Sequence, residues 1–448
     1  MRADSDTGGV TEVPSMRVAA ADRFFLCFDG AQPPPSCIWT FLLEGAPPPD
    51  AQRLRTAVAA AVAAHPKAAC RIASRSSWSP PLWERLPRSE LDLILEAPRP
   101  RTADEGELLD DVVSRFHRAF DVSRGPLLRL EWRRVGAADG ALVFHFHHAL
   151  GDGSGSLAVL RDAIRAYGGL PIDEPAIPAS APRVRLRGLL RYAFAQARHV
   201  PFRAPDHVYD ANTQPTGRLD LAHRRFPAPT LAAAAVSRTT GPTAVLAAAC
   251  ALAVERFRKD RRRSCRHIRL GVSVSLRDQA SWHALDNRSA AVSVSIAPAD
   301  CAEPGRLAAT IQQRLRLARR HRVAESMAAL APSLLIPTPI AAALVRRLAR
   351  ARGLDSLFLA NVGNLAVAGE PIDAWIAPLG GCLRRAWVLS RPAEGIGATL
   401  NVCVAGDAVH LSLCFLRGLL NRDDAERLLD LVVAFVEESP RRDEVSTL

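Results

Sequence analysis

Residues 144–153 read FHFHHALGDG, and this stretch decides which fold we expect for the chain. It places two adjacent histidines, His147 and His148, at the end of an apolar run. Asp152 and Gly153 follow after a short gap, and residues 154–156, SGS, open a new segment of apolar periodicity. A base at a strand end, an acid one turn later and a backbone shaped by glycine are the parts of a general-base site.

The two histidines point to opposite faces of the strand that we predict over residues 141–148, because side chains alternate along a strand. One histidine can therefore face a cavity while the other packs into the body of the fold. A neutral imidazole with an ordinary pKa can accept a proton from a hydroxyl, amine or thiol at physiological pH.

Asp152 has two possible roles. It can orient the histidine, as in a catalytic triad, or it can turn inward and hold the loop through an ion pair. Arg277, at the end of the alternating strand 271–276, is the candidate partner, although it can equally be a plain exposed arginine. Gly153 precedes a predicted helix, so its N–H can face a developing oxyanion near the positive helix end. The glycine can also simply permit the turn.

Other site chemistries lack their signatures. The sequence contains no G-x-S-x-G nucleophile elbow, no Gly-Lys-[Ser/Thr] phosphate loop and no H-E-x-x-H zinc motif. The nine cysteines are scattered without C-x-x-C or Cys/His ligand spacing, so neither a zinc site nor a disulfide framework is indicated. We expect no metal, no bound cofactor, and a reducing, cytoplasmic compartment.

The charge pattern is basic and local. The chain carries 58 Lys and Arg against 46 Asp and Glu, a formal net charge of +12, and the excess lies in residues 183–191, 256–269, 314–322 and 346–352. Aromatic residues make up only 6% and are not interleaved with these runs, which disfavours nucleic acid as a partner. Solvated arginine on helix faces is the simplest interpretation, and attraction of an anionic partner such as CoA or an acidic protein is the alternative.

A chain of 448 residues is too long for one simple core, so we expect two α/β lobes, each a mixed sheet with helices. Residues 1–16 are predicted to be a disordered lead-in without a signal peptide, residues 17–170 the N-terminal lobe, residues 171–217 a proline-rich linker around a helix near 186–197, and residues 218–448 the C-terminal lobe. The predicted helices are 51–65, 108–120, 156–167, 242–257, 307–321 and 423–437. The predicted strands are 126–135, 141–148, 219–226, 268–276, 290–297, 356–362, 382–389, 399–405 and 408–416.

Residues 327–345 are the nearest approach to a membrane span. Prolines at 332, 337 and 339 interrupt this apolar stretch. We therefore expect a buried crossover or the wall of a hydrophobic tunnel rather than a spanning helix, and not an integral membrane protein.

The stretch HHALGDG at residues 147–153 resembles the HHxxxDG signature of the CoA-dependent acyltransferase superfamily. This group includes chloramphenicol acetyltransferase, plant BAHD enzymes, condensation domains of non-ribosomal peptide synthetases, alcohol O-acetyltransferases and bacterial wax ester/diacylglycerol acyltransferases. The resemblance extends from about residue 19 to the C-terminus. It includes HP at 65–66, FDVSRGPLLR at 120–129, VSLR at 274–277, DN at 286–287 and NVG at 361–363.

Two departures from family patterns narrow the choice of branch within this superfamily. The "PLW" strand entry of wax ester synthases is replaced by PLL at 126–128, and the BAHD motif "DFGWG" is absent. The resemblance therefore favours a free-standing enzyme of the condensation-domain-like or bacterial alcohol acyltransferase type.

The resemblance implies two chloramphenicol-acetyltransferase-like lobes with an active-site tunnel between them. It implies that His148 is the general base and that Asp152 is mainly structural, paired to an arginine for which Arg277 is the matching candidate. His147 and Asn287 would help to organise the site, and backbone donors near Gly153 would hold the oxyanion.

The expected reaction follows from this resemblance. An acyl group on CoA or on the phosphopantetheine arm of a carrier protein would pass to a small alcohol or amine, in secondary metabolism, with the protein acting as a monomer. Two alternatives stay open: a lipid enzyme that esterifies long-chain alcohols or diacylglycerol, and a catalytically silent module that docks a carrier protein.

Overall fold

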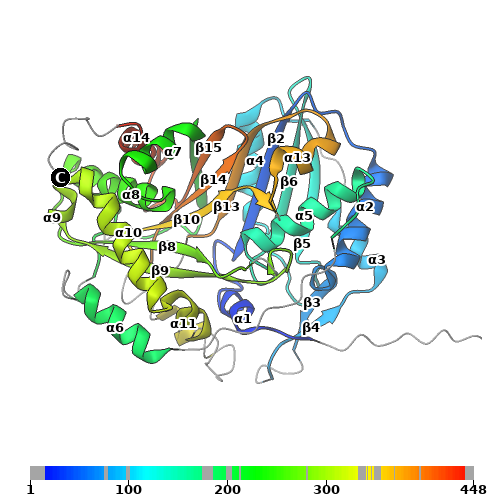
Figure 1. The fold of residues 1–448 in the computed structure, drawn as a ribbon. Coiled ribbons are helices and arrows are strands. Elements are labelled where there is room, and N and C mark those ends of the chain that lie inside the picture. Colours follow the sequence, from blue (N-terminus) through cyan, green and yellow to red (C-terminus); the bar gives the residue numbers. More distant parts are fainter. Residues whose placement is uncertain are drawn as a thin grey trace, which may run out of the picture.

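Two sheets, each covered by helices, form the body of the protein in the computed structural model (Figure 1). The structure describes residues 16–74, 79–96, 101–173, 185–197, 204–210, 213–278, 281–330, 340, 342–344, 346–347, 355–367, 369–392 and 395–438. The mixed α/β class and the two-lobed arrangement that the sequence predicts are confirmed.

The first sheet has four antiparallel strands in the order β13 (Cys382–Ser390), β2 (Ser36–Glu44), β6 (Asp139–His147) and β5 (Leu128–Val135). One face packs large side chains such as Trp39, Phe41 and Phe144 into the core beneath helices α2 (Ala51–Ala64) and α5 (Gly153–Tyr167). Helix α4 (Glu105–Phe116) covers the opposite face. The sheet is therefore buried on both sides, and β6 delivers the motif to its end.

The second sheet has six strands in the order β7 (Leu219–Pro227), β15 (Ala408–Leu416), β14 (Ala398–Ala405), β10 (Leu357–Asn364), β8 (Ile268–Ser275) and β9 (Ser289–Ile296). It is mixed, because β10 runs parallel to both of its neighbours and the other pairs are antiparallel. Helices α7 (Ala228–Ser237), α8 (Pro242–Asp260), α10 (Pro304–Arg320) and α14 (Arg422–Glu437) form the core with it. The alanine-rich α8 is buried along most of its length, which explains why its sequence is apolar on all sides.

The smaller elements complete the described chain. They are β1 (Met16–Arg17), α1 (Ala20–Leu26), η1 (Pro66–Ala69), β3 (Cys70–Ala73), β4 (Leu82–Arg85), α3 (Arg88–Leu91), η2 (Asp92–Ile94), α6 (Leu186–Ala197), α9 (Pro298–Cys301), α11 (Val323–Leu330), β11 (Ala366–Val367), β12 (Glu370–Pro371), α13 (Ile372–Ile376) and η4 (Ala377–Leu379).

The strand β13 lies in a different sheet from the one that its sequence position suggests. We predicted residues 382–389 as a strand of the C-terminal lobe, but β13 pairs antiparallel with β2, from Cys382 opposite Glu44 to Ser390 opposite Cys37. Alternation along a strand predicts its buried face but not its neighbour, which explains the difference. The first sheet is consequently shared by both halves of the chain, and it is antiparallel rather than mixed.

Several element boundaries also differ from the expected ones. Helix α4 begins at Glu105 because the Asp104 side chain accepts a hydrogen bond from the Glu107 N–H, and it ends at Phe116 rather than at residue 120. Strand β2 was not predicted, because its residues are almost continuously buried and show no alternation.

Three sequence predictions fall partly outside the described residues. Of the lead-in 1–16, only Met16 is described; it belongs to β1 and pairs with Trp83 of β4. Residues 174–184, 198–203 and 211–212 of the predicted linker lie outside the described part. Within residues 327–345, described apolar side chains such as Met327 and Ile340 are each 48% exposed, so the buried crossover that we expected is wrong at these positions.

Candidate active site

The residues of the sequence motif lie in one compact corner between the two sheets. His148 directly follows β6, and α5 begins at Gly153. The connection between β8 and β9 lies over this corner, where the Asp152 N–H donates to the Asp286 carbonyl at 3.3 Å. The structure therefore brings together all the site residues that we singled out: His147, His148, Asp152, Gly153, Arg277 and Asn287.

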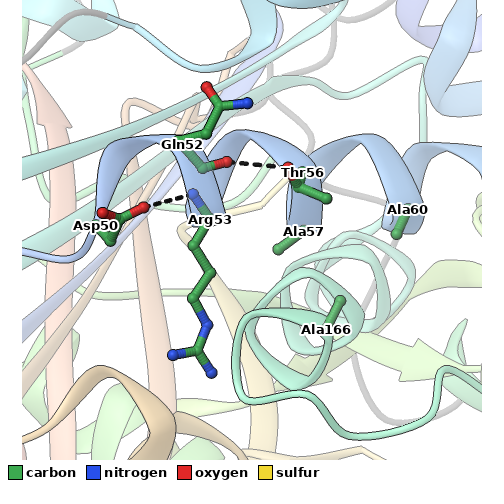
Figure 2. Close-up of a pocket in the computed structure, with 7 residues that line it drawn as sticks. All are labelled: Asp50, Gln52, Arg53, Thr56, Ala57, Ala60 and Ala166. Atoms are coloured by element: carbon green, nitrogen blue, oxygen red, sulfur yellow. Dashed lines mark hydrogen bonds between the residues drawn. The ribbon is translucent and has the colours of Figure 1, made fainter.

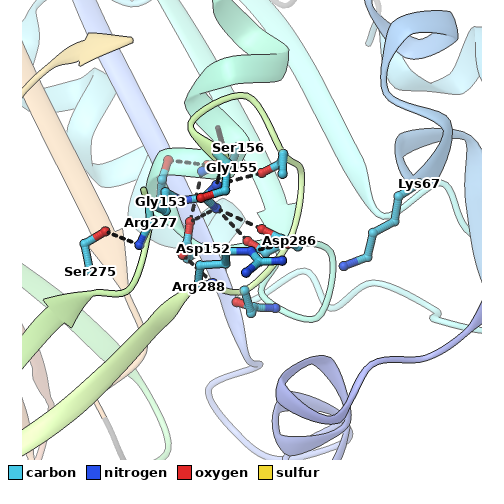
Figure 3. A network of polar contacts seen from close by, with 12 residues as sticks. Lys67, Asp152, Gly153, Gly155, Ser156, Ser275, Arg277, Asp286 and Arg288 are labelled. Carbon is cyan, nitrogen blue, oxygen red and sulfur yellow. Dashed lines mark hydrogen bonds and ion pairs between the residues drawn. The ribbon is translucent and has the colours of Figure 1, made fainter. Parts of the chain in front are cut away.

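Asp152 is buried, and both of its carboxylate oxygens are occupied (Figure 3). Oδ1 accepts from the Gly155 N–H at 2.9 Å, which makes Asp152 the N-cap of α5, and from Arg277 Nη2 at 2.7 Å. Oδ2 accepts from the Arg288 N–H at 2.8 Å. A carboxylate that caps a helix and also receives two donors from the other lobe holds the loop in place, and none of these hydrogen bonds goes to the His148 ring.

Arg277 is the centre of this inter-lobe contact, and its side chain is only 1% exposed. Nη1 donates to the carbonyls of Ser281 at 2.7 Å and Ala284 at 2.9 Å, while Nη2 also donates to the Asp286 carbonyl at 2.7 Å. One guanidinium thus fixes its own loop and ties that loop to Asp152. A buried charge with this many acceptors is a structural anchor rather than an exposed strand-end arginine.

Two glycines at the start of α5 differ in what an added side chain would meet. A Cβ at Gly155 would lie 2.7 Å from Arg277 Nη2 and 2.9 Å from the Ala284 carbonyl oxygen, so any side chain would push the two lobes apart. A Cβ at Gly153 would meet only the Trp39 ring at 3.4 Å, an ordinary contact, and this glycine does not have a positive φ. The turn therefore does not require Gly153, whereas the lobe contact requires Gly155, which the sequence interpretation passed over.

His147 is buried and held as a neutral ring. Its Nδ1 accepts the Ala149 N–H at 3.1 Å, which leaves the proton on Nε2. Burial, with a smaller contribution from the nearby His148, lowers the pKa of His147 to about 3. This histidine shapes the turn through the backbone and stays uncharged.

His148 is oriented by Asn287. The Asn287 Nδ2 donates to Asp22 Oδ1 at 2.9 Å and to the His148 carbonyl at 2.8 Å, so its Oδ1 is the atom that faces His148 Nδ1 at 3.2 Å. An amide oxygen can only accept, which places the ring proton on Nδ1 and leaves a lone pair on Nε2. No partner of Nε2 is found within the described ranges.

The surroundings of the His148 ring keep it neutral. The Phe25 ring of α1 stacks on the imidazole at 3.7 Å with planes 10° apart. Burial lowers the pKa of His148, and Asp152, Asn287 and Asp22 partly oppose this shift. A neutral imidazole with an unprotonated Nε2 is the form that a general base needs at neutral pH.

Sequence reasoning missed two residues behind Asn287. Buried Asp22 of α1 receives Asn287 on Oδ1 and Lys67 Nζ on Oδ2 at 2.8 Å, which extends the chain of contacts to His148–Asn287–Asp22–Lys67. The ammonium group of Lys67 points toward the motif (Figure 3) and lies 4.8 Å from the centre of the Trp83 ring. Lys67 is one of only two lysines in a chain rich in arginine, and this rarity was the available signal.

A hollow of about 430 Å³ lies elsewhere, over α2 and the end of α5 (Figure 2). Its lining is Asp50, Gln52, Arg53, Thr56, Ala57, Ala60 and Ala166. The Asp50 carboxylate there caps α2 by accepting the Arg53 N–H at 2.7 Å, and Thr56 Oγ1 donates to the Gln52 carbonyl. These polar groups are used by the helix itself, so the hollow is not the site of the motif.

Among the residues that the structure describes, no group of three or more His, Cys, Asp or Glu side chains is arranged to hold a metal ion. None of the helices described there combines the length and the apolar character that crossing a bilayer requires.

Three solved structures resemble the whole chain. The TRI3 trichothecene 15-O-acetyltransferase of Fusarium sporotrichioides has a TM-score of 0.70 at 11% identity, and the match covers 96% of this chain and 97% of that one. The starter condensation domain of rhizomide synthetase RzmA, in a variant form, has a TM-score of 0.66 at 12% identity, with 97% of each chain covered. The wax ester synthase/diacylglycerol acyltransferase of Marinobacter aquaeolei VT8 has a TM-score of 0.59 at 19% identity, with 94% of this chain and 98% of that one covered. The chain has the condensation-domain fold. This is the fold of the CoA-dependent acyltransferases that the motif resembles.

Similarity in sequence covers a smaller part of the chain than similarity in fold does. No protein-family model matches the chain. Two uncharacterized proteins of Mycobacterium tuberculosis, Rv2305 (strain H37Rv) and MT2362 (strain CDC 1551), are each 33% identical over 141 residues. This match spans 31% of the chain and 31% of either relative's length.

Proposed function

We propose that the protein is an acyltransferase that moves an acyl group from a thioester to a hydroxyl or amine, with His148 as the general base. The observation that carries the proposal is the orientation of one ring: Asn287 accepts from Nδ1, so Nε2 is the basic atom. Its lowered pKa keeps that atom unprotonated at neutral pH.

The reaction balances without a covalent enzyme intermediate. Nε2 of His148 takes the proton of the acceptor hydroxyl or amine while the acceptor attacks the thioester carbonyl carbon. The carbonyl oxygen becomes an oxyanion as the tetrahedral intermediate forms. When this collapses, the C–S bond breaks and the thiolate takes the proton from Nε2, which yields the ester or amide, the free thiol and neutral His148.

We assign the oxyanion to the backbone at the start of α5. The Gly153 N–H is at the first position of the helix, and no acceptor for it is found among the described residues. A free N–H at a helix N-terminus stabilises negative charge that develops in the transition state.

The donor is proposed to be an acyl-CoA or an acyl group on a carrier protein. The structurally similar starter condensation domain of rhizomide synthetase RzmA, in a variant form, was crystallised in complex with C8-CoA and Leu-SNAC. The formal net charge of +12 suits either an anionic CoA or an acidic carrier protein. We further place the protein in secondary metabolism, acting as a monomer in the cytoplasm.

A donor and acceptor screen tests this function. Octanoyl-CoA and octanoyl-carrier protein would be supplied separately with small alcohols, amines, a long-chain alcohol and diacylglycerol, and thiol release and product mass would be followed. We expect product with at least one pair and a loss of about 10²- to 10⁴-fold in His148→Ala. His321→Ala, a histidine at the end of α10, is the matched control and should keep full activity.

Three outcomes are informative. Turnover only with the lipid acceptors would make the protein a lipid acyltransferase. Binding of carrier protein without turnover on any pair would identify a silent docking module. Product formation by His148→Ala at the rate of the unmodified protein would refute the general-base role.

A further inference from the structure

Helix α6 is anchored to the C-terminal lobe by one face. Tyr192 is buried and its hydroxyl donates to the Ser293 carbonyl at 2.8 Å, while Leu189 packs against the buried cluster that includes Tyr192. The Arg185 N–H donates to Ser326 Oγ at 3.1 Å, which joins the start of α6 to α11. Figure 1 shows α6 at the outside of the lobe, beside α11 and near β9, the edge strand of the second sheet. Its orientation is therefore set, and its other face points outward.

That outward face carries an apolar stripe. Leu186, Leu190 and Phe194 follow one another at intervals of four residues and are 64%, 52% and 70% exposed. Side chains four apart lie on the same side of a helix, so the three form one line along α6. Of the eleven large apolar side chains that are exposed in the described chain, six fall in residues 186–194 and 327–344. The three on α6 form one line on a single helix, which indicates an interaction surface rather than scattered exposure.

Arginines border the stripe. Arg185, Arg187 and Arg191 are exposed, and residues 185–197 contain no Asp or Glu. No ion pair of these three arginines occurs within the described residues. The neighbouring stretch 304–330 carries six arginines and a single acid, Glu325. The surface is thus apolar along its centre and strongly positive at its edges.

We propose that α6 docks the protein onto an anionic lipid bilayer and lies in the plane of its interface. Leucine and phenylalanine side chains enter the boundary of the acyl chains, and the arginines beside them reach the lipid phosphates. At 12 residues, α6 is about 18 Å long, too short to cross the hydrocarbon core. A second copy of the chain fits less well, because a two-fold contact would set the same arginines against each other.

Vesicle sedimentation with the full-length protein tests this surface. Vesicles of phosphatidylcholine alone would be compared with vesicles that also contain phosphatidylglycerol. We expect binding that depends on phosphatidylglycerol and falls as salt is added, because salt screens the arginines. Phe194→Ser should lower the partition coefficient about tenfold. The pair Arg187→Gln and Arg191→Gln should lower it about thirtyfold.

Matched controls lie on the same lobe. Val236→Ser removes an apolar side chain that is 77% exposed on α7, and Arg256→Gln removes an arginine that is 66% exposed on α8. Both variants should bind like the unmodified protein. Circular dichroism and the unfolding midpoint would establish that every variant is folded.

Other results would overturn the proposal. These are an unmodified protein that binds neither vesicle, equal binding to both vesicle types, or a Phe194→Ser variant that binds as the unmodified protein does. A dimer in solution that Phe194→Ser abolishes would reassign the stripe to self-association. Because sedimentation reads binding and not turnover, failure here leaves the acyltransfer proposal untouched, and the reverse also holds.

Discussion

His148 and Asp152 stand four residues apart at the two ends of one turn, and their polar atoms are used in opposite ways. Asp152 receives donors on both oxygens and holds α5, Arg277 and the backbone of Arg288 together. His148 has one nitrogen engaged by Asn287, while Nε2 lacks a partner in the described chain. The carboxylate of Asp152, whose two oxygens both accept hydrogen bonds, therefore holds the structure together. The imidazole of His148, which keeps one nitrogen unbonded, is available for chemistry.

The largest expected effects distinguish the role of His148 in turnover from the role of Asp152 and its partner Arg277 in stability. His148→Ala should reduce turnover by about 10²- to 10⁴-fold and leave the unfolding midpoint nearly unchanged. Arg277→Met should instead lower the free energy of unfolding by about 3–5 kcal/mol, because it leaves the Asp152 carboxylate buried without its cation. Urea titration and thiol-release kinetics on both variants measure the two quantities. A His148→Ala protein that is as unstable as Arg277→Met would contradict the assignment of His148 to chemistry and of Arg277 to structure.

The second prediction concerns the adjacent histidine. The pKa of His147 is lowered to about 3, that of His410 to about 4, and that of His145 well below its usual value, all chiefly by burial. Between pH ~6.5 and ~4 the unfolded chain therefore binds protons that the folded chain does not, so stability falls as the pH falls. Each histidine contributes up to about 1.4 kcal/mol per pH unit.

A variant isolates the contribution of His147. His147→Asn keeps an acceptor for the Ala149 N–H but cannot titrate, so its stability should decline less steeply with acid than that of the unmodified protein. Urea midpoints taken at intervals from neutral pH to the acid limit would show the slope. Identical slopes for the two proteins would mean that His147 is not the titrating group.

The third prediction compares two glycines at the start of α5. Gly155→Ala should destabilise the fold by about 1–3 kcal/mol, because its Cβ would collide with the Arg277 guanidinium and a backbone carbonyl. Gly153→Ala is the matched control, since a Cβ there has room beside Trp39. Thermal unfolding of both variants gives the comparison, and a Gly155→Ala midpoint equal to that of Gly153→Ala would contradict it.

The smallest expected effects are shifts in the pH dependence of turnover. Asp22 raises the pKa of His148, so Asp22→Asn should move the acid limb of the rate profile to lower pH. Lys67→Met leaves the Asp22 charge uncompensated and should move the limb to higher pH. Shifts in opposite directions, each of about one unit or less, would establish that Asp22 and Lys67 position and tune His148. Unshifted profiles in both variants would make the pair purely structural.

The sequence predicted the motif residues of the candidate site but not the residues behind them, and the reasons are physical. The helices and most strands follow from periodicity, and the motif residues follow from residue type and spacing. Asp22 and Lys67 escaped notice because each contact joins residues far apart in the chain, such as Asn287 and Asp22. No local pattern encodes such pairs. The same limit applies to β13, whose alternation indicates a strand but not which sheet receives it.

The placement of β13 has a consequence for how the protein is made. The first sheet is mostly encoded early, in β2, β5 and β6, yet its edge beside β2 is completed by residues 382–390. During synthesis, β2 therefore emerges with one side unpaired, and that side stays open until most of the chain has left the ribosome. The late strand closes the first lobe and joins it to the second in one step, so neither lobe reaches its final form alone.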